Sequence, residues 1–415
     1  MSTVCPDCRK QLSRLASACA RIGWVLAVGM ALFGCSSQNE AGAPAMEISK
    51  ASAPDSRAED LVRIRMDGKW GFIDGKGEMA IPPGFERVRN FSASGLPGGL
   101  AAVRENGKWG YIDARGEKLI PPKFEEALDF AANGLAVIVE NGKYGYIDTS
   151  GKVAIPPRFG FGFEDLVGGA LDFSANNLAA FQENGKWGYI DARGEKLIPA
   201  GFEAASAFSA NGLALVRKEG RAGYINAKGE VAIPLKKGVS ALPFAANGLA
   251  GVEENGKWGF IDTQGKMAIP PQFEAISGFS PDGLAAVKEG GKWGFINTQG
   301  KMQIPPSFEK MPSSFFRNGF LQIEENGKFG YIDTKGEKRI PPRFQFVFDF
   351  EANGLAMFKD DGKVGYLDAQ GQTVALIDEV CDTEVLKNGR GEITWPKKTA
   401  ARICEERSAR PAQKE

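Results

Sequence analysis

The stretch GKWGYIDARGEKLIPPKF, residues 107–124, decides how this chain folds. An apolar segment and then Asn106-Gly107 introduce it, and Asn-Gly between apolar runs predicts a tight hairpin because both turn positions need positive φ. Asp113-Ala114-Arg115-Gly116 has Asp first and Gly fourth, as a type I turn prefers. The last strand either ends at Pro121 or lies at a sheet edge, since proline has no amide hydrogen to donate. The stretch therefore predicts a three-stranded antiparallel meander.

The same pattern recurs along the chain with a basic period of 35–36 residues. Its central glycines are Gly71, Gly110, Gly145, Gly188, Gly223, Gly259, Gly294, Gly330 and Gly365. A phenylalanine follows the first proline of the Ile-Pro segment by three residues in seven of eight copies, and another precedes the next copy. One such unit cannot bury its own apolar face, so neighbouring units must share a core. We predict an all-β tandem array of about nine three-stranded meanders, each followed by an aromatic-bearing linker.

An array of this kind can be open or closed. Nine copies exceed the four to eight blades usual in propellers. The last copy has Ala375-Leu376 where Ile-Pro is expected, which is typical of a terminal cap. We therefore expect an open superhelical solenoid over residues 61–376, with a closed β-propeller as the alternative.

The motif Gly-Lys-Trp-Gly-Tyr-Ile-Asp, followed by Ile-Pro-Pro-x-Phe, resembles the bacterial WG repeat, also called the KWG repeat. The resemblance covers residues 61–376. It implies bacterial repeat modules without general catalytic activity and with mostly unassigned partners.

The first 60 residues read as an export signal and a tether. A basic flank precedes an apolar run at 22–33, which is too short to span a bilayer as a helix and is typical of a signal peptide. Leu32-Phe33-Gly34-Cys35 resembles the bacterial lipobox, so residues 1–35 are expected to be a signal peptide and Cys35 the lipidated mature N-terminus. Ser36 follows that cysteine and favours the outer membrane. Residues 36–60, rich in small and charged residues, are predicted to be a flexible tether.

Composition narrows the function. The number of Lys and Arg residues equals the number of Asp and Glu residues, at 51 each, which disfavours nucleic-acid binding. Histidine is absent, and it is the commonest general base and metal ligand in proteins. No nucleotide-binding loop, nucleophile elbow or metal-ligand cluster is present, so we expect no enzyme, metal or cofactor. Two functions stay open: a membrane-anchored scaffold for protein–protein interaction in the cell envelope, or a cell-envelope glycan-binding protein using the repeat aromatics and lysines.

Two recurring positions decide between packing and recognition. The residue before the motif glycine is Trp70, Trp109, Tyr144, Trp187, Ala222, Trp258, Trp293, Phe329 or Val364. Its replacement by Ala and Val favours core packing over sugar stacking. The basic residue before it is Lys69, Lys108, Lys143, Lys186, Arg221, Lys257, Lys292, Lys328 or Lys363. In a stack these cations would form a rail for an anionic polymer, although an acid often precedes the turn and favours a solvated lysine.

Residues 377–415 are expected to be a C-terminal cap or tail, with Trp395-Pro396 opening a short helix through Arg407. Cys381 and Cys404 are the only cysteines after Cys35, and export would place them in an oxidising compartment. We predict a disulfide between them.

Overall fold

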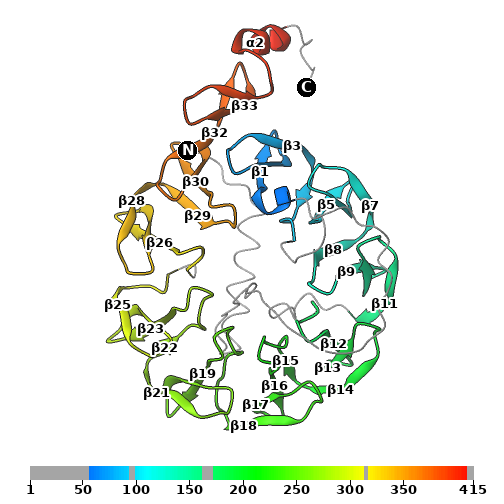
Figure 1. The fold of residues 1–415 in the computed structure, drawn as a ribbon, viewed down its shortest axis with the longest axis vertical. Helices are drawn as coiled ribbons and strands as arrows, with labels where there is room; N and C mark the ends of the chain where they lie inside the picture. The colour runs from blue at the N-terminus through cyan, green and yellow to red at the C-terminus, as the bar shows by residue number, and fades with distance from the viewer. Residues whose placement is uncertain (1–55, 93–98, 161–171, 313–315, 409–415) are drawn as a thin grey trace, which may run out of the picture.

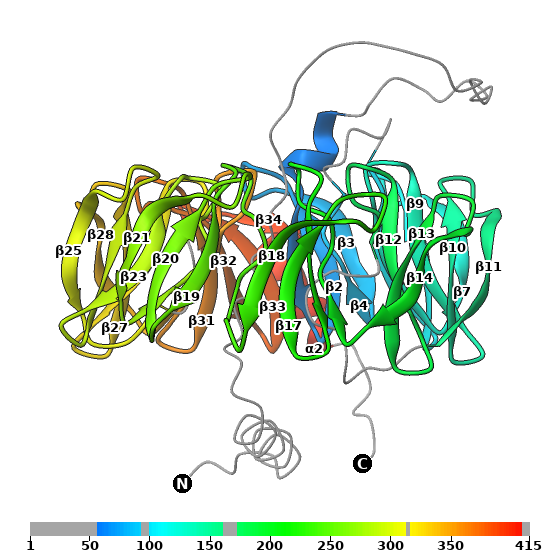
Figure 2. The same ribbon diagram turned by 90° about the horizontal axis from the view of Figure 1, so that it is seen from below.

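The computed structural model describes residues 56–92, 99–160, 172–312 and 316–408. Within them nine antiparallel sheets follow one another around a common axis and close into a ring, a nine-bladed β-propeller (Figure 1). Seen from the side, the ring is a disc whose hairpins lie on its two faces (Figure 2). The all-β tandem array is confirmed, and the closed propeller rather than the open solenoid is its architecture.

The sheets are built from strands β1–β34, and each sheet takes its strands from one continuous part of the chain. The first four sheets comprise β1 (Val62–Met66), β2 (Lys69–Ile73) and β3 (Met79–Phe85); β4 (Arg87–Val88), β5 (Ala101–Glu105), β6 (Lys108–Ile112) and β7 (Lys118–Phe124); β8 (Glu126–Phe130), β9 (Leu135–Glu140), β10 (Lys143–Asp148) and β11 (Val153–Gly160); and β12 (Leu178–Glu183), β13 (Lys186–Asp191) and β14 (Lys196–Phe202). The next three comprise β15 (Ala204–Ala205), β16 (Ala214–Lys218), β17 (Arg221–Ile225) and β18 (Val231–Lys237); β19 (Ala250–Glu254), β20 (Lys257–Ile261) and β21 (Met267–Phe273); and β22 (Ala275–Ile276), β23 (Ala285–Glu289), β24 (Lys292–Ile296) and β25 (Met302–Phe308). The last two comprise β26 (Phe320–Glu325), β27 (Lys328–Asp333) and β28 (Lys338–Phe344); and β29 (Phe346–Phe350), β30 (Ala356–Asp360), β31 (Lys363–Leu367), β32 (Thr373–Val380), β33 (Thr383–Asn388) and β34 (Ile393–Trp395).

The linker predicted between meanders is a strand in five blades. There it forms a short innermost strand, such as β8 or β15, so these sheets gain a strand on the side of the axis (Figure 1). A single residue, Glu125, separates the outer strand β7 from β8 of the next blade. Its carboxylate accepts hydrogen bonds from the amides of Asn141 and Gly142 in the next hairpin turn. The prediction missed these strands because two to five residues are too few to show alternation.

The motif glycine allows the outer strand to cross it closely. At Gly110 a Cβ atom would overlap the Ile120 carbonyl oxygen and lie 2.6 Å from the Pro122 nitrogen. The register jumps from Trp109↔Phe124 to Tyr111↔Ile120 around it, so Gly110 has no partner in β7, although it pairs with Val103 of β5. This is the close backbone approach that glycine in a strand predicts.

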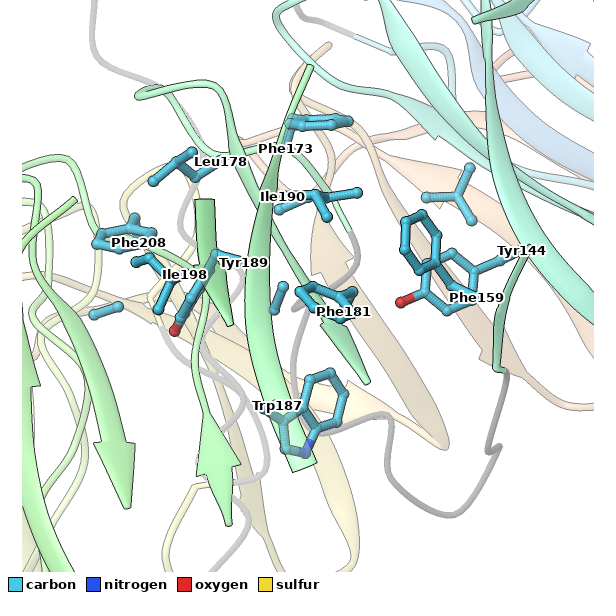
Figure 3. Close-up of a cluster of buried hydrophobic side chains, with 14 of the residues drawn as sticks. Tyr144, Phe159, Phe173, Leu178, Phe181, Trp187, Tyr189, Ile190, Ile198 and Phe208 are labelled. Carbon is cyan, nitrogen blue, oxygen red and sulfur yellow. The ribbon is translucent and has the colours of Figure 1, made fainter. Parts of the chain in front are cut away.

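Neighbouring blades join through two recurring contacts. The second motif aromatic packs on the phenylalanine that opens the next blade, as Tyr189 does on Phe208 with ring centroids 4.7 Å apart (Figure 3). The isoleucine of the Ile-Pro segment packs on the turn glycine of the next blade, so that a Cβ at Gly151 would lie 3.1 Å from Ile120. Each blade therefore completes the core of its neighbour, as expected for a tandem array.

The ring closes through the same contacts. The Tyr366 hydroxyl of the last blade donates to the Arg63 carbonyl oxygen of the first, 2.6 Å away. Gly77 of the first blade lies against Ala375, the residue at the isoleucine position of the last copy. Ala375-Leu376, interpreted from sequence as a cap, therefore belongs to the closing joint.

The C-terminal segment extends the last blade instead of forming a separate cap. β33 and β34 add to β32, which crosses the predicted repeat boundary at 376/377 (Figure 1). Asn388 and Gly391 form the same turn as in the repeats, and Leu386 packs with residues of the first blade, so the extension is a degenerate tenth copy. Helix α2 (Ala400–Ser408) begins later than predicted, after Thr399, whose carbonyl oxygen accepts from the Ile403 amide.

The structure also corrects the predicted tether. Residues Ser56–Asp60 form the 3₁₀ helix η1, and Ala58 is buried against the first two blades. Cys35, the predicted lipidation site, lies outside the described residues, as do the signal segment 1–35 and residues 36–55. Among the described helices, none is long and apolar enough to cross a bilayer.

Candidate functional site

The motif aromatics belong mainly to the core. Trp109, Trp187 and Trp293 are buried, and Trp70 and Trp258 are partly buried. Figure 3 shows Trp187 among the buried side chains between blades. These tryptophans offer no row of exposed rings for sugar stacking.

The repeated carboxylates and amides are committed to turns. The Asp113 carboxylate accepts hydrogen bonds from the amides of Arg115, at 3.0 Å, and Glu117, at 2.8 Å. The same pair of bonds is made by Asp74, Asp148, Asp191, Asn226, Asp262, Asn297, Asp333 and Asp368. Asn serves as well as Asp at this position, so its role is structural.

The row of basic residues is exposed in eight blades, but acids offset it. In seven blades the basic residue lies opposite an acidic residue of the neighbouring hairpin strand, as Lys143 lies opposite Glu140. Some of these cations also bind an acid of the outer strand; Lys363 lies 3.2 Å from Asp378. In blade five the partner of Arg221 is instead Lys218. The described hairpins therefore form no continuous cationic rail. Among them, only in blade five do two basic residues pair across the hairpin.

Charged side chains gather on or beside the first strands of blades near the closing joint. This inner cluster comprises Arg63, Arg89, Glu126, Asp172 and Glu351: Arg89 lies 3.0 Å from Glu126, and Arg63 lies 3.9 Å from Glu351. Desolvation, and then repulsion by Asp129, raise the pKa of Asp172 to about 6 against the attraction of Arg89. Such a group changes charge near neutral pH.

The inner cluster occupies one arc of the ring. The residue before the recurring phenylalanine is polar or acidic in blades two, three, four and nine, namely Asn90, Asp129, Asp172 and Asp349. In blades five to seven it is Ala207, Pro243 or Gly278. Sequence reasoning missed the cluster because Arg63, Arg89, Glu126 and Glu351 are not part of the repeat motif; only Asp172 lies at this variable position, which carried the one available signal.

A shallow depression of about 650 Å³ lies between blades eight and nine. It is lined by Phe320, Asp333, Lys335, Arg339 and Gln370, among others. Desolvation alone would raise the pKa of Asp333, but hydrogen bonds from the Glu337 and Lys335 amides and from Arg339 lower it. This carboxylate is therefore a poor general base.

The described part of the chain contains no group of three or more Cys, Asp or Glu side chains placed to hold a metal ion. Cys381 and Cys404, the pair predicted from sequence, form a disulfide with Cα atoms 5.2 Å apart. It ties α2 to the turn between β32 and β33.

Among the similar solved structures, one with a TM-score above 0.5 supports the fold and nothing beyond it. The crystal structure of the eukaryotic initiation factor is 12% identical, with a TM-score of 0.56, and the match covers 81% of this chain and 97% of that one. The dihydro-heme d1 dehydrogenase NirN in complex with DHE is 13% identical, with a TM-score of 0.40, covering 81% of this chain and 75% of that one. No curated protein matches the chain.

The family comparison covers most of the ring. The model described as "WG containing repeat" matches eight consecutive segments: 70–109, 109–144, 144–187, 187–221, 223–258, 258–293, 293–329 and 329–363. These segments run from one motif aromatic toward the next, so they are the eight intervals between nine copies. Together they span more than half of the sequence. The chain belongs to the family of proteins with the WG-containing repeat.

Proposed function

We propose that this protein is a non-enzymatic scaffold for protein–protein interaction in the bacterial cell envelope, anchored to a membrane through lipidated Cys35. One observation carries the proposal: the repeated chemistry is used by the fold itself. The motif aromatics pack in or against the core, and the repeated Asp or Asn closes a turn in all nine blades. Partners are then recognised by what differs between blades.

The anchor supports this assignment. A lipidated cysteine followed by a segment of 20 residues, 36–55, before the first described helix would hold the ring near a membrane surface while its faces stay accessible. Two or three acyl chains provide stable anchoring where one is marginal. The glycan alternative loses its main support, because the motif tryptophans are not arranged as exposed stacking platforms.

The test is affinity purification of the tagged full chain from membranes of its own cells after in-cell cross-linking, with Cys35→Ala as the anchoring control. We expect one or a few envelope proteins to be retained and to be displaced by excess untagged protein. Cys35→Ala should move the protein from the membrane to the soluble fraction. Polysaccharide binding on an envelope-glycan array without a displaceable protein partner would overturn the proposal in favour of glycan recognition.

A further inference from the structure

The outer strand of blade five differs from those of seven other blades. In those seven the motif glycine has no partner in the outer strand, because the register jumps across it. In blade five Gly223 pairs with Pro234, and in blade nine Gly365 pairs with Leu376. Bulges and prolines are means by which proteins prevent other strands from joining a sheet edge. Blade nine has no register shift at its motif glycine. Blade five keeps a smaller shift between Arg221 and Gly223, where the outer strand has one extra residue instead of the two found in the seven blades.

Blade nine shows what such an edge does in this molecule. Its outer strand β32 pairs with β33 from Ala375↔Asn388 to Val380↔Thr383, so an additional strand has joined it. β18 is the corresponding strand of blade five, and it is the last strand of its sheet among the described residues. It lies on the periphery of the ring (Figure 1). Its outer edge has no strand partner in the described chain.

The sequence explains why the bulge of β18 is smaller than in the seven other blades. Six blades have Ile-Pro-Pro in the outer strand, whereas blade five has Ile233-Pro234-Leu235. Losing the second proline is not sufficient, because blade four has Pro199-Ala200 and keeps its motif glycine unpaired. Blade five has also lost the aromatic pair that flanks the bulge elsewhere: Ala222 replaces tryptophan, and Lys237 stands at the phenylalanine position. The shift in register brings Lys237 opposite Arg221.

The two ends of β18 differ chemically. Val231, at its start, is 63% exposed, the highest value among the large exposed hydrophobic residues of the described chain. At its end Lys218, Arg221 and Lys237 are exposed and lie in register across three adjacent strands. Neighbouring strands are about 4.8 Å apart, so these three charges form a compact row.

The acids near this row do not neutralise it. Glu203 accepts hydrogen bonds from the amides of Glu219 and Gly220, so its carboxylate is directed at the turn. Glu219 is the second acid of the hairpin and is exposed within that turn. Three cations therefore face two acids, whereas in seven other blades the basic residue has an acid as its cross-hairpin partner.

We propose that the outer edge of β18 is a docking site for an extended segment of a partner protein, which adds to blade five as a further strand. This inference rests on the proposed scaffold function and names the chemistry of the partner. The segment matches the seven residues of β18 in length. It carries acidic residues at the end beside Lys237 and apolar residues at the end beside Val231. Main-chain hydrogen bonds would supply affinity, and the side chains at the two ends would supply orientation.

The test uses synthetic peptides and the full mature chain. Two heptapeptides with blocked ends and a fluorescent label are used, each of alternating valine and threonine except for two glutamates at one end. The first has the glutamates at its N-terminus and would add antiparallel to β18; the second has them at its C-terminus and would add parallel to β18. Lysine replaces glutamate in a control pair. We expect one glutamate peptide to bind in fluorescence anisotropy and to slow amide exchange in β18. Lys237→Glu should weaken that peptide at least tenfold and strengthen binding of its lysine counterpart.

Two further variants separate the edge from general charge. Leu235→Pro restores the Ile-Pro-Pro sequence of the other blades and is expected to abolish peptide binding. Lys292→Glu, at the Arg221 position of the bulged blade seven, should leave binding within twofold of the wild type. Binding of neither glutamate peptide, or equal loss in Lys237→Glu and Lys292→Glu, would overturn the inference.

The outcome for the scaffold function is read separately. If the cross-linked partner from membranes is retained by Lys237→Glu and Leu235→Pro alike, the scaffold function stands and the β18 docking site is wrong. If the partner is lost with both variants and retained by Lys292→Glu, the docking site is supported in the native setting. If wild-type chain retains no partner at all, the proposed function itself fails, whatever the peptides do.

Discussion

The hydroxyl group of Tyr366 donates to the backbone carbonyl of Arg63 at 2.6 Å, joining the last blade to the first. Within the ring the Tyr224 hydroxyl donates in the same way to the Leu242 carbonyl of the following blade, at 2.7 Å. The closing joint thus reuses the bond that links neighbours elsewhere. It differs in one respect, since the 303 residues that separate Tyr366 from Arg63 run around the whole ring.

Replacing Tyr366 with phenylalanine tests the closing joint. The variant should fold, because Phe72, Phe260 and Phe295 occupy the equivalent positions of other blades. We expect a loss of about 1 kcal/mol, the usual net value of one such hydrogen bond. Hydrogen exchange should accelerate in β1 and β31. Tyr224→Phe is the matched control and should leave exchange in β1 unchanged; equal acceleration by both variants would contradict a distinct closing joint.

Motif glycines should differ in their tolerance of a methyl group. Gly110→Ala places a Cβ within the Ile120 carbonyl oxygen, so the bulge must shift, and overpacking of this kind costs roughly 1–3 kcal/mol. Gly223→Ala meets its nearest atom, the Ile233 oxygen, at 3.3 Å and should cost clearly less. Thermal unfolding of the two variants measures the difference. Equal destabilisation would show that pairing of Gly223 with Pro234 does not relieve the crowding at the motif glycine.

Removing the disulfide should loosen the extension without opening the ring. The bond closes a loop with a sequence separation of 23, for which the chain-entropy estimate is about 3 kcal/mol. In Cys381→Ser/Cys404→Ser we expect faster hydrogen exchange in α2 and easier proteolysis there. Exchange in β16 and β17, on the far side of the ring, is the internal control. Unchanged protection of α2 would mean that packing of Ile403 holds the helix by itself.

The inner cluster should make stability depend on pH. Because folding raises the pKa of Asp172 to about 6, the folded state binds this proton more tightly than the unfolded state. Asp172 therefore disfavours folding above pH 6, and this penalty disappears as pH falls toward 4. Asp172→Asn should stabilise the protein at pH 7 by about 1–2 kcal/mol, allowing for partial exposure. The gain should vanish near pH 4; a gain independent of pH would refute this account.

The repeat unit could be predicted from sequence because its signals are local. The Asn-Gly turns and the Asp-x-x-Gly turn each act within a few residues, and both appear in the structure. The predicted strand end at Ile-Pro was wrong, because β7 continues through Pro121 to Phe124 as the outer strand of its sheet, where a missing amide donor is tolerated. Asn106, for example, has a φ of 49° and Gly107 a φ of 75°. The pairing of Cys381 with Cys404 was also accessible, since few cysteines were left to combine.

Closure could not be predicted because it depends on the wedge angle between sheets. That angle follows from how Tyr189 fits Phe208, or Ile120 fits the turn at Gly151, at each of the joints. No single repeat shows whether such wedges add up to a full turn. The departure of the last copy from the Ile-Pro sequence was misleading for a related reason. Ala375 is small because Gly77 of the first blade and the C-terminal extension pack against it, and this contact is not visible in the sequence.

The one-residue connection between an outer strand and the next blade has a consequence for folding order. Most contacts between blades join residues close in the chain, such as Tyr111 and Leu128, which are 17 residues apart. These contacts can form as the chain emerges, at little loop-closure entropy. Only the joint made by Tyr366 and Asn353, which binds the Asp60 carbonyl 293 residues away, must wait for the complete chain. A truncated or stalled chain would therefore be a curved, partly assembled arc with two unmated sheet faces, the species that chaperones and proteases would meet.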